Sequence, residues 1–171
     1  LIFNFKKYKI MKKIIVLIIT FFAIQTQAQL IQGEIKINQQ SKAEISIKSN
    51  KIVNLYAAFR ENKHKVNFVF TATDVPLNSE KQEVVQFVFT TVVKKDGKTI
   101  GSIKRNPIPF FPGDMFMPVE TFDFISILSN IQTNTNDRIS EIPKGNYEII
   151  LEAKPIGVKG NISSAKFFLK L

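Results

Sequence analysis

The sequence of 171 residues contains no cysteine and no tryptophan, and its only histidine is His64. Without cysteine, the chain has no disulfide framework, no thiolate metal site and no cysteine nucleophile. A single histidine does not make a metal site, and between Lys63 and Lys65 it gives no basis for a Ser-His-Asp arrangement. We therefore expect His64 to be an ordinary turn residue, and we expect no catalytic residue, no bound metal and no cofactor.

The short motifs of several common enzyme classes are also missing. The sequence contains no Gly-x-Gly-x-x-Gly, no Gly-x-x-x-x-Gly-Lys-Ser/Thr, no His-Glu-x-x-His and no Gly-x-Ser-x-Gly. These motifs bind dinucleotides, nucleoside phosphates and catalytic zinc, or present a serine nucleophile. Their absence argues against those classes and favours a protein that binds a partner without transforming it.

Negative charge is scarce, since 14 acidic residues face 24 lysines and arginines and give a formal net charge of +10. Residues 1–28 contain five of the lysines and no acid, so residues 29–171 carry +5. A moderately basic surface of this kind suits an anionic polymer, but it is not the composition of a nucleic-acid-binding protein. We expect no nucleic acid partner.

Residues 11–28 have the pattern of a secretory signal peptide. Met11 and two lysines precede an apolar run from Ile14 to Ile24, and a polar segment then ends at Ala28. We expect cleavage after Ala28, export to the periplasm or the cell exterior, and no transmembrane segment afterwards. An uncleaved anchor helix is the alternative, although the run is shorter than the roughly 20 apolar residues of a membrane span. Residues 1–10 precede the first methionine and look like an over-extended start.

Residues 29–171 are expected to form a single, mostly β domain. Hydrophobic residues make up 44% of the sequence and phenylalanine alone occurs 16 times, which is enough for a substantial core. Apolar residues alternate with polar ones in several short segments that are separated by turn residues, a pattern typical of a sandwich or barrel. These segments are 30–37, 43–47, 53–59, 66–72, 84–93, 147–153 and 165–171.

The strongest local signal is a hairpin from Val84 to Arg105, centred on Asp96-Gly97. Its first arm has apolar residues on both faces, so we expect a central strand that is covered on both sides. The register stays open, because a two-residue loop pairs Val93 with Ile100, whereas a three-residue loop pairs Val92 with Ile100.

Two segments after the hairpin differ from the strands. Residues 106–118 contain four prolines, which predicts a stiff apolar loop outside the sheet. Residues 119–132 place Phe124, Ile127, Leu128 and Ile131 at helical spacing, which predicts one short crossover helix. A strand is the competing interpretation of the second segment.

The last third of the chain resembles a known type of module. Pro143, Gly145 and Tyr147 open a strand after the crossover, and a final strand runs from Ser164 to Leu171. This arrangement is similar to the immunoglobulin-like or fibronectin type III-like modules of bacterial secreted proteins. The resemblance implies an antiparallel, immunoglobulin-like β-sandwich and no catalytic residue. The paired cysteines and the tryptophan of true immunoglobulin domains are missing.

Two sets of residues are candidates for binding a partner. Large apolar side chains in the proline-rich loop are the first, because stiff loops that carry aromatics bind at low entropic cost; they are Phe110, Phe111, Met115, Phe116 and Met117. The alternative is that this loop caps one end of the sandwich and buries them. A basic patch on the hairpin is the second set, formed by Lys94, Lys95, Lys98, Lys104 and Arg105. Such lysines also protect a sheet edge from aggregation.

Two functions remain possible from the sequence. The first is a secreted or periplasmic, non-catalytic β-sandwich that binds a protein or a surface polymer, as an adhesion, accessory or chaperone-like module. The second is a small secreted hydrolase or carbohydrate-binding domain that uses the acids of the segment from Asp114 to Asp123, including Glu120. The second function requires these carboxylates to converge in one cleft.

Overall fold

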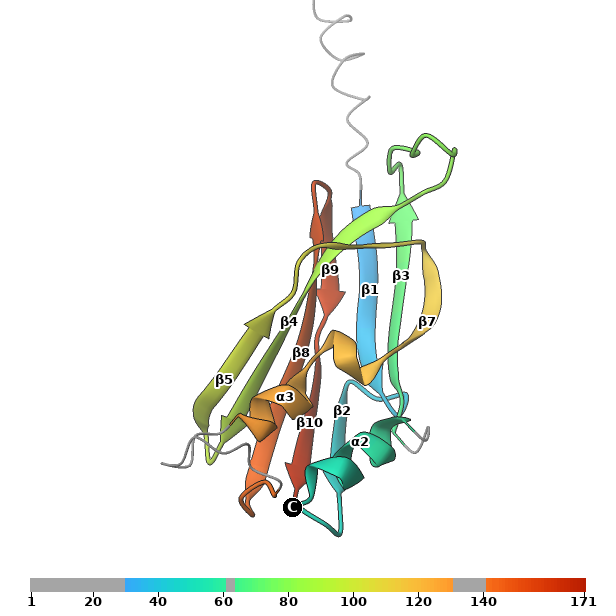
Figure 1. Ribbon diagram of the computed structural model, residues 1–171. Coiled ribbons are helices and arrows are strands. Elements are labelled where there is room, and N and C mark those ends of the chain that lie inside the picture. The colour runs from blue at the N-terminus through green and yellow to red at the C-terminus, as the bar shows by residue number, and fades with distance from the viewer. Residues whose placement is uncertain (1–29, 61–63, 131–140) are drawn as a thin grey trace, which may run out of the picture.

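The computed structural model describes residues 30–60, 64–130 and 141–171 (Figure 1). The predicted leader and its cleavage site lie outside these residues. The strands are β1 (Leu30–Ile37), β2 (Lys42–Ser46), β3 (Val66–Thr73), β4 (Val85–Lys95), β5 (Lys98–Lys104), β6 (Ile108–Phe110), β7 (Gly113–Met117), β8 (Asn146–Ile156), β9 (Lys159–Ser163) and β10 (Ala165–Lys170). The helical segments are α2 (Ile52–Arg60), the 3₁₀ helix η1 (Val119–Thr121) and α3 (Phe124–Ser129).

The described strands form two sheets that pack against each other. The four-stranded sheet has the order β7-β3-β1-β9, and the six-stranded sheet has the order β2-β10-β8-β4-β5 with β6 paired to β4. The prediction of a mostly β chain is confirmed. The prediction of purely antiparallel pairing is wrong, because β1 pairs in parallel with β9 and β2 in parallel with β10. Both sheets are therefore mixed.

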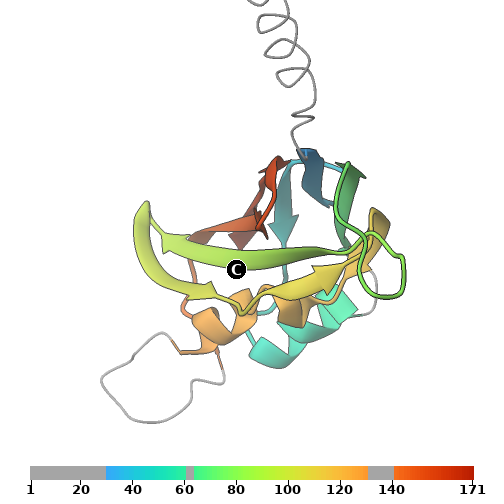
Figure 2. The same ribbon diagram turned by 90° about the horizontal axis from the view of Figure 1, so that it is seen from above.

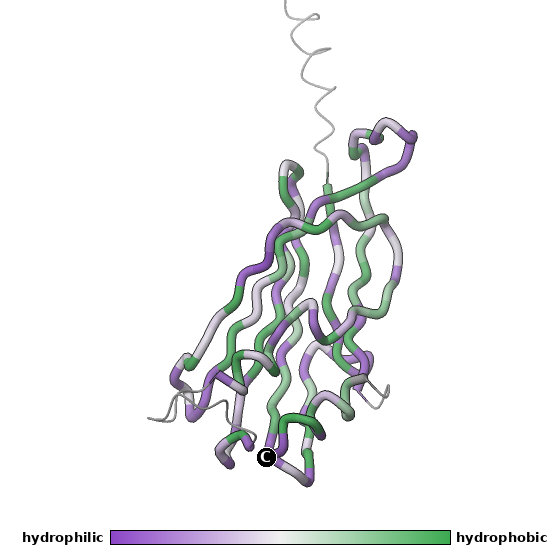
Figure 3. Tube along the Cα trace, viewed as in Figure 1, coloured by the Kyte–Doolittle hydropathy of each residue, from purple (hydrophilic) through white to green (hydrophobic). Residues whose placement is uncertain are grey.

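The core lies between the inner faces of the sheets, and the period of two along each strand explains its composition. On β1, Ile31, Ile35 and Ile37 are fully buried, while Gln32, Glu34 and Lys36 lie on the opposite, outward face. Beside this row, Phe68 of β3 packs edge to face on Phe87 of β4 in the opposite sheet, with ring centroids 4.9 Å apart. Figure 3 shows the alternation of hydropathy along the strands of the six-stranded sheet.

The helices cover the part of the six-stranded sheet that the four-stranded sheet leaves open (Figures 1 and 2). Phe59 of α2 and Phe124 of α3 both contact Phe167 of β10, at ring centroid distances of 5.8 and 5.3 Å. Helix α3 also packs closely on β5, since a Cβ at Gly101 would lie 2.4 Å from the Ile127 side chain. The predicted crossover helix is thus present, in a shorter form.

The strand predicted over residues 53–59 is wrong, because this segment is helix α2. Leu55 and Phe59 are buried four residues apart, whereas Val53 is largely exposed. Leu55 and Phe59 fit both a strand row and a helix stripe, and only packing of the segment onto α3 distinguishes the two. The fold therefore has two α-helices among the described residues instead of the single one expected.

The hairpin at Asp96-Gly97 is confirmed. Both residues have positive φ, 48° and 79°, as a two-residue type I′ turn requires. Lys95 pairs with Lys98, but a bulge then shifts the register so that Val93 pairs with Gly101. Ile100 is the extra residue at the bulge, so neither predicted pairing of Ile100 occurs.

The segment 106–118 is not a loop outside the sheets, as predicted, but contributes two short edge strands. Strand β6 places Pro109 opposite Gln86 of β4, and β7 pairs with β3 at the margin of the other sheet. Proline is tolerated in β6 because an edge strand leaves one side of its backbone unpaired, and Pro112 and Pro118 flank β7 without entering it. The chain crosses from one sheet to the other between Phe110 and Gly113 (Figure 1).

Candidate binding surface

The outer face of the six-stranded sheet carries mostly exposed or half-exposed side chains, and no described element covers it. We use this name for the side that faces away from the helices and the four-stranded sheet. Strand alternation and the pairing registers place six lysines and three glutamates on it. These residues are Lys42, Lys94, Lys104, Lys154, Lys166, Lys170, Glu44, Glu148 and Glu152. The outer face thus carries an excess of three positive charges.

This finding corrects the prediction that β4 is covered on both sides. Strand β4 is central, between β8 and β5, but Val92 on its outward side and Val84 just before the strand remain partly exposed. Only Val88 is buried there. The outward valines therefore line a surface that solvent reaches.

Part of the charge on the outer face is neutralised within the sheet. Glu148 accepts contacts from Lys166 Nζ at 2.7 Å and Lys94 Nζ at 3.3 Å. The hydrogen bond from Lys166, with smaller contributions from Lys94, lowers the pKa of Glu148 below its usual value. Lys42 Nζ lies 5.3 Å from the ring centroid of Phe168. These contacts order the half of the face that surrounds Glu148.

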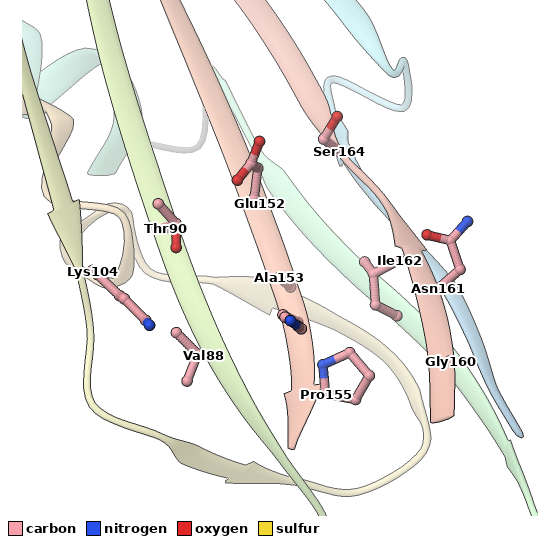
Figure 4. A pocket seen from close by; sticks show the side chains of 11 residues that line it. Val88, Thr90, Lys104, Glu152, Ala153, Pro155, Gly160, Asn161, Ile162 and Ser164 are labelled. Atoms are coloured by element: carbon pink, nitrogen blue, oxygen red, sulfur yellow. The ribbon is translucent and has the colours of Figure 1, made fainter. Parts of the chain in front are cut away.

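The other half of the outer face contains a groove of about 490 Å³ (Figure 4). It opens where β10 begins, because Ala165 pairs with Leu151 and no described strand pairs with the rest of β8 on that side. There the chain turns from β8 into β9, which joins the other sheet, and the two sheets part. The apolar part of the lining comes from Val88, Pro155 and Ile162.

The polar side chains of the groove are available to a ligand. Lys104 of β5 and Lys154 of β8 lie on the two sides of β4, and Glu152 and Thr90 lie between or beside them. Asn161 and Ser164 line the opposite wall (Figure 4). Within the described part of the chain, neither lysine nor Glu152 forms an ion pair. The groove therefore combines two unneutralised cations, one carboxylate and several hydroxyl or amide groups.

The structure divides the basic patch that the sequence suggested. Lys94 and Lys104 lie on the outer face, and Lys98 lies at the hairpin tip. Lys95 Nζ lies 5.5 Å from the ring centroid of Tyr147, which is buried on the inner face. Arg105 donates to the Glu120 carbonyl at 2.6 Å and forms an ion pair with Asp123, which neutralises its charge.

Sequence reasoning missed the contribution of β8 and β9 to this surface. Lys154, Glu152, Asn161 and Ser164 lie about 50 or more positions after Lys104 and carry no motif. The one usable signal was the alternation of Glu152 and Lys154 with buried Leu151 and Ala153. Such alternation indicates an exposed face, but it does not say which other strand lies beside it.

The apolar candidates of segment 106–118 also separate into two groups. Phe110, Met115 and Met117 face the core, in line with the capping alternative. Phe111 and Phe116 are exposed, at 55% and 63% of their surface. Lys65 Nζ lies 4.9 Å from the Phe116 ring centroid, a cation–π contact at the margin of the four-stranded sheet.

The acids of the alternative function have separate structural partners. Asp114 accepts a hydrogen bond from the Asn67 side chain at 3.2 Å, and Asp123 pairs with Arg105. Among the described residues, no three histidine, cysteine or acidic side chains group closely enough to hold a metal ion. His64 lies in a bend, and the Asn38 side-chain amide donates to its Nδ1 at 3.1 Å. These contacts give Asp114, Asp123 and His64 structural roles.

Comparison with protein-family models, with curated proteins and with solved structures finds no match for this chain. Its function is therefore inferred from its own residues. In the described part of the chain, no helix has both the length and the apolar character needed to cross a bilayer.

Proposed function

We propose that this chain is an exported, non-catalytic β-sandwich that binds an anionic surface polymer on the outer face of its six-stranded sheet. The observation that carries the proposal is the uncovered face with three excess positive charges and two lysines, Lys104 and Lys154, that no described acid neutralises. A groove lined by unpaired cations attracts polyanions and raises their local concentration.

A polymer fits this surface better than a small ligand does. At a strand spacing of about 4.8 Å, lysines on β2 and β5, at the two margins of the sheet, are roughly 19 Å apart. A single sugar or phosphate cannot reach both margins, whereas an extended chain can lie across the strands. The open groove would hold one unit of that chain, and the lysines around it would contact its neighbours.

The remaining parts of the proposal have separate support. Export to the periplasm or the cell exterior depends on the leader pattern of residues 11–28. The immunoglobulin-like assignment draws on the strand opened by Pro143, Gly145 and Tyr147, where the Tyr147 hydroxyl donates to the Pro143 carbonyl. A tyrosine that bonds back to the backbone a few residues upstream is a feature of many immunoglobulin-like sandwiches.

The test is a charge-matched comparison of two double variants. Lys104→Gln with Lys154→Gln removes the groove cations, while Lys98→Gln with Lys159→Gln removes two exposed lysines outside the groove. We expect the first variant to bind dextran sulfate about tenfold or more weakly, and the second less than about threefold, in titrations at two salt concentrations. Equal losses in the two variants would mean that only net charge matters, and the proposed surface would be wrong.

A second candidate is a protein partner that docks on Phe111 or Phe116. The observation in its favour is that two large rings of segment 106–118 lie exposed, Phe111 at the crossing between the sheets and Phe116 on the edge strand β7. Aromatic side chains are enriched at protein interfaces. Capture of one partner from an envelope extract by the wild type, lost in a Phe111→Ser, Phe116→Ser variant, would support this candidate.

A further inference from the structure

We propose that the groove recognises a uronic acid unit, a sugar that carries both a carboxylate and several hydroxyl groups. The inference rests on the proposed function and names the chemistry of the polymer. The residue that distinguishes this ligand from other anions is Glu152, whose carboxylate lies in the groove beside the two free lysines.

Glu152 is unfavourable for an anion that has no hydrogen-bond donor. Lys104, Thr90 and Glu152 form one row across β5, β4 and β8, and Lys154 follows Glu152 by two residues on the same face. A phosphate chain that contacts both lysines therefore comes close to a negative charge and offers it no proton. Like-charge contacts of this kind select against a ligand.

A polyhydroxylated anion turns the same carboxylate into a favourable partner. Sugar hydroxyls donate to a carboxylate, and such charge-assisted bonds are stronger than neutral ones. The side chains of Thr90, Asn161 and Ser164 add donors and acceptors around the groove. The two lysines bind the sugar carboxylate. The cationic, anionic and neutral polar side chains of the lining therefore all find a partner group on a uronic acid.

The apolar lining and the size of the groove agree with this ligand. Val88 and Pro155 offer a surface to the C–H groups of a sugar ring. The volume of about 490 Å³ lies within the usual range for small-ligand sites. None of the described aromatic side chains lines the groove, so they offer no base stacking of the kind that single-stranded nucleic acids require.

The test compares two polyanions and two variants of the exported protein after purification. Oligogalacturonate carries carboxylates and hydroxyls, whereas polyphosphate carries only the anionic groups. Glu152→Met removes the groove carboxylate and keeps an unbranched side chain of similar length. Glu44→Met makes the same change in charge on the same face, outside the groove.

For Glu152→Met we expect oligogalacturonate affinity to fall about fivefold or more and polyphosphate affinity to rise about twofold, in calorimetric titrations at one salt concentration. Glu44→Met should change the affinity for both polymers slightly and in the same direction, upward. The opposite response of the two polymers to one substitution is what a purely electrostatic surface cannot produce.

The outcomes separate this inference from the proposed function. If Glu152→Met raises the affinity for both polymers alike, the groove is a general polyanion site. The uronic acid inference is then overturned, while the proposed function stands. If the wild type binds neither polymer, or if Lys104→Gln with Lys154→Gln leaves both affinities unchanged, the proposed function fails and the inference fails with it.

Discussion

The two faces of the six-stranded sheet are built from alternate residues of the same strands, yet they differ in almost every physical property. On β8, Tyr147 and Leu151 are fully buried on the inner face, whereas Glu152 and Lys154 are exposed on the outer face. The inner face is covered by the second sheet and by two helices, as the contacts of Phe68, Phe59 and Phe124 show. The outer face is covered by none of the described elements and carries the excess positive charge.

Within one strand, the inner residues therefore stabilise the fold, whereas the outer residues are accessible to a partner. Burial of apolar surface stabilises the fold through the inner residues, and the outer residues contribute little to that term. Lysines can therefore accumulate on the outer face without disturbing the core. It follows that substitutions on the two faces should affect different measurements.

The largest expected effect comes from a pair of neighbours on β8. Leu151→Ala should lower the free energy of unfolding by about 2–5 kcal/mol, because it leaves a cavity between the sheets. Ile150→Ala removes a partly exposed side chain of the same size from the outer face and should cost about 1 kcal/mol or less. Urea denaturation measures both. Similar losses would show that the outer face is also covered in solution.

The register of β4 and β5, which the turn at Asp96-Gly97 fixes, determines which residues of β5 lie on each face. A slip of one residue would exchange the inner and outer residues of β5. Gly97→Val places a β-branched residue at a φ of 79° and should destabilise the protein by roughly 1 kcal/mol or more.

Asp96→Asn is the control for the hairpin tip, because asparagine tolerates the left-handed conformation that Asp96 adopts. Its thermal unfolding should stay close to that of the wild type. An unchanged melting temperature in Gly97→Val as well would place the turn elsewhere.

Tyr147 is a titratable side chain that is fully buried on the inner face, unlike the exposed charged side chains of the outer face. Burial, together with the negative charge of Asp96, raises the pKa of Tyr147 above its ordinary value. An unfolded tyrosine ionises near pH 10, before the folded one does. Stability from this group is therefore complete below about pH 10 and is lost as the pH rises further.

Tyr147→Phe isolates this contribution, since lysines also lose their charge at alkaline pH in both proteins. The stability difference between wild type and variant should be constant below about pH 10 and should move in favour of the variant above it. Unfolding curves at closely spaced pH values measure the difference. A constant difference up to pH 11 would mean that Tyr147 is more accessible than its buried position indicates.

The smallest effect on stability is expected at the two exposed rings of segment 106–118. Phe111→Ser with Phe116→Ser should change the free energy of unfolding by about 1 kcal/mol or less, because both side chains are more than half exposed. Phe110→Ser, one position away, should cost more, since this ring packs against Phe68 and Phe89. A double variant that barely folds would exclude a docking role for these rings.

Much of the sheet content could be predicted from the sequence because alternation is a local property. The segments 30–37, 66–72, 147–153 and 165–171 are strands in the structure, and Asp96-Gly97 forms the expected turn. The wrong predictions concern segments whose apolar spacing fits both a helix and a strand, or whose pairing depends on their place in the sheet. Leu55 and Phe59 satisfy both periods, and Pro109 is compatible with a strand only because β6 lies at an edge.

The candidate surface could be predicted only in part. Lys94 and Lys104 belonged to the basic patch proposed from the sequence, and both lie on the outer face. Arg105 belonged to the same patch, but its place at the end of β5 directs it to Asp123 on the inner side. A strand reverses the direction of its side chains at every residue, so neighbours in sequence need not share a surface.

The sequence by itself determined the local elements, the amphipathic character of the strands and the low supply of catalytic side chains, since these depend on residue type and short spacing. Only the tertiary structure decided that β9 leaves β8 to join the other sheet, and that this parting of the sheets opens a groove. It also decided that Lys104 and Lys154 share that groove with Glu152. Such pairings join residues about 50 positions apart, and they are selected by the packing of the whole core, which no local pattern encodes.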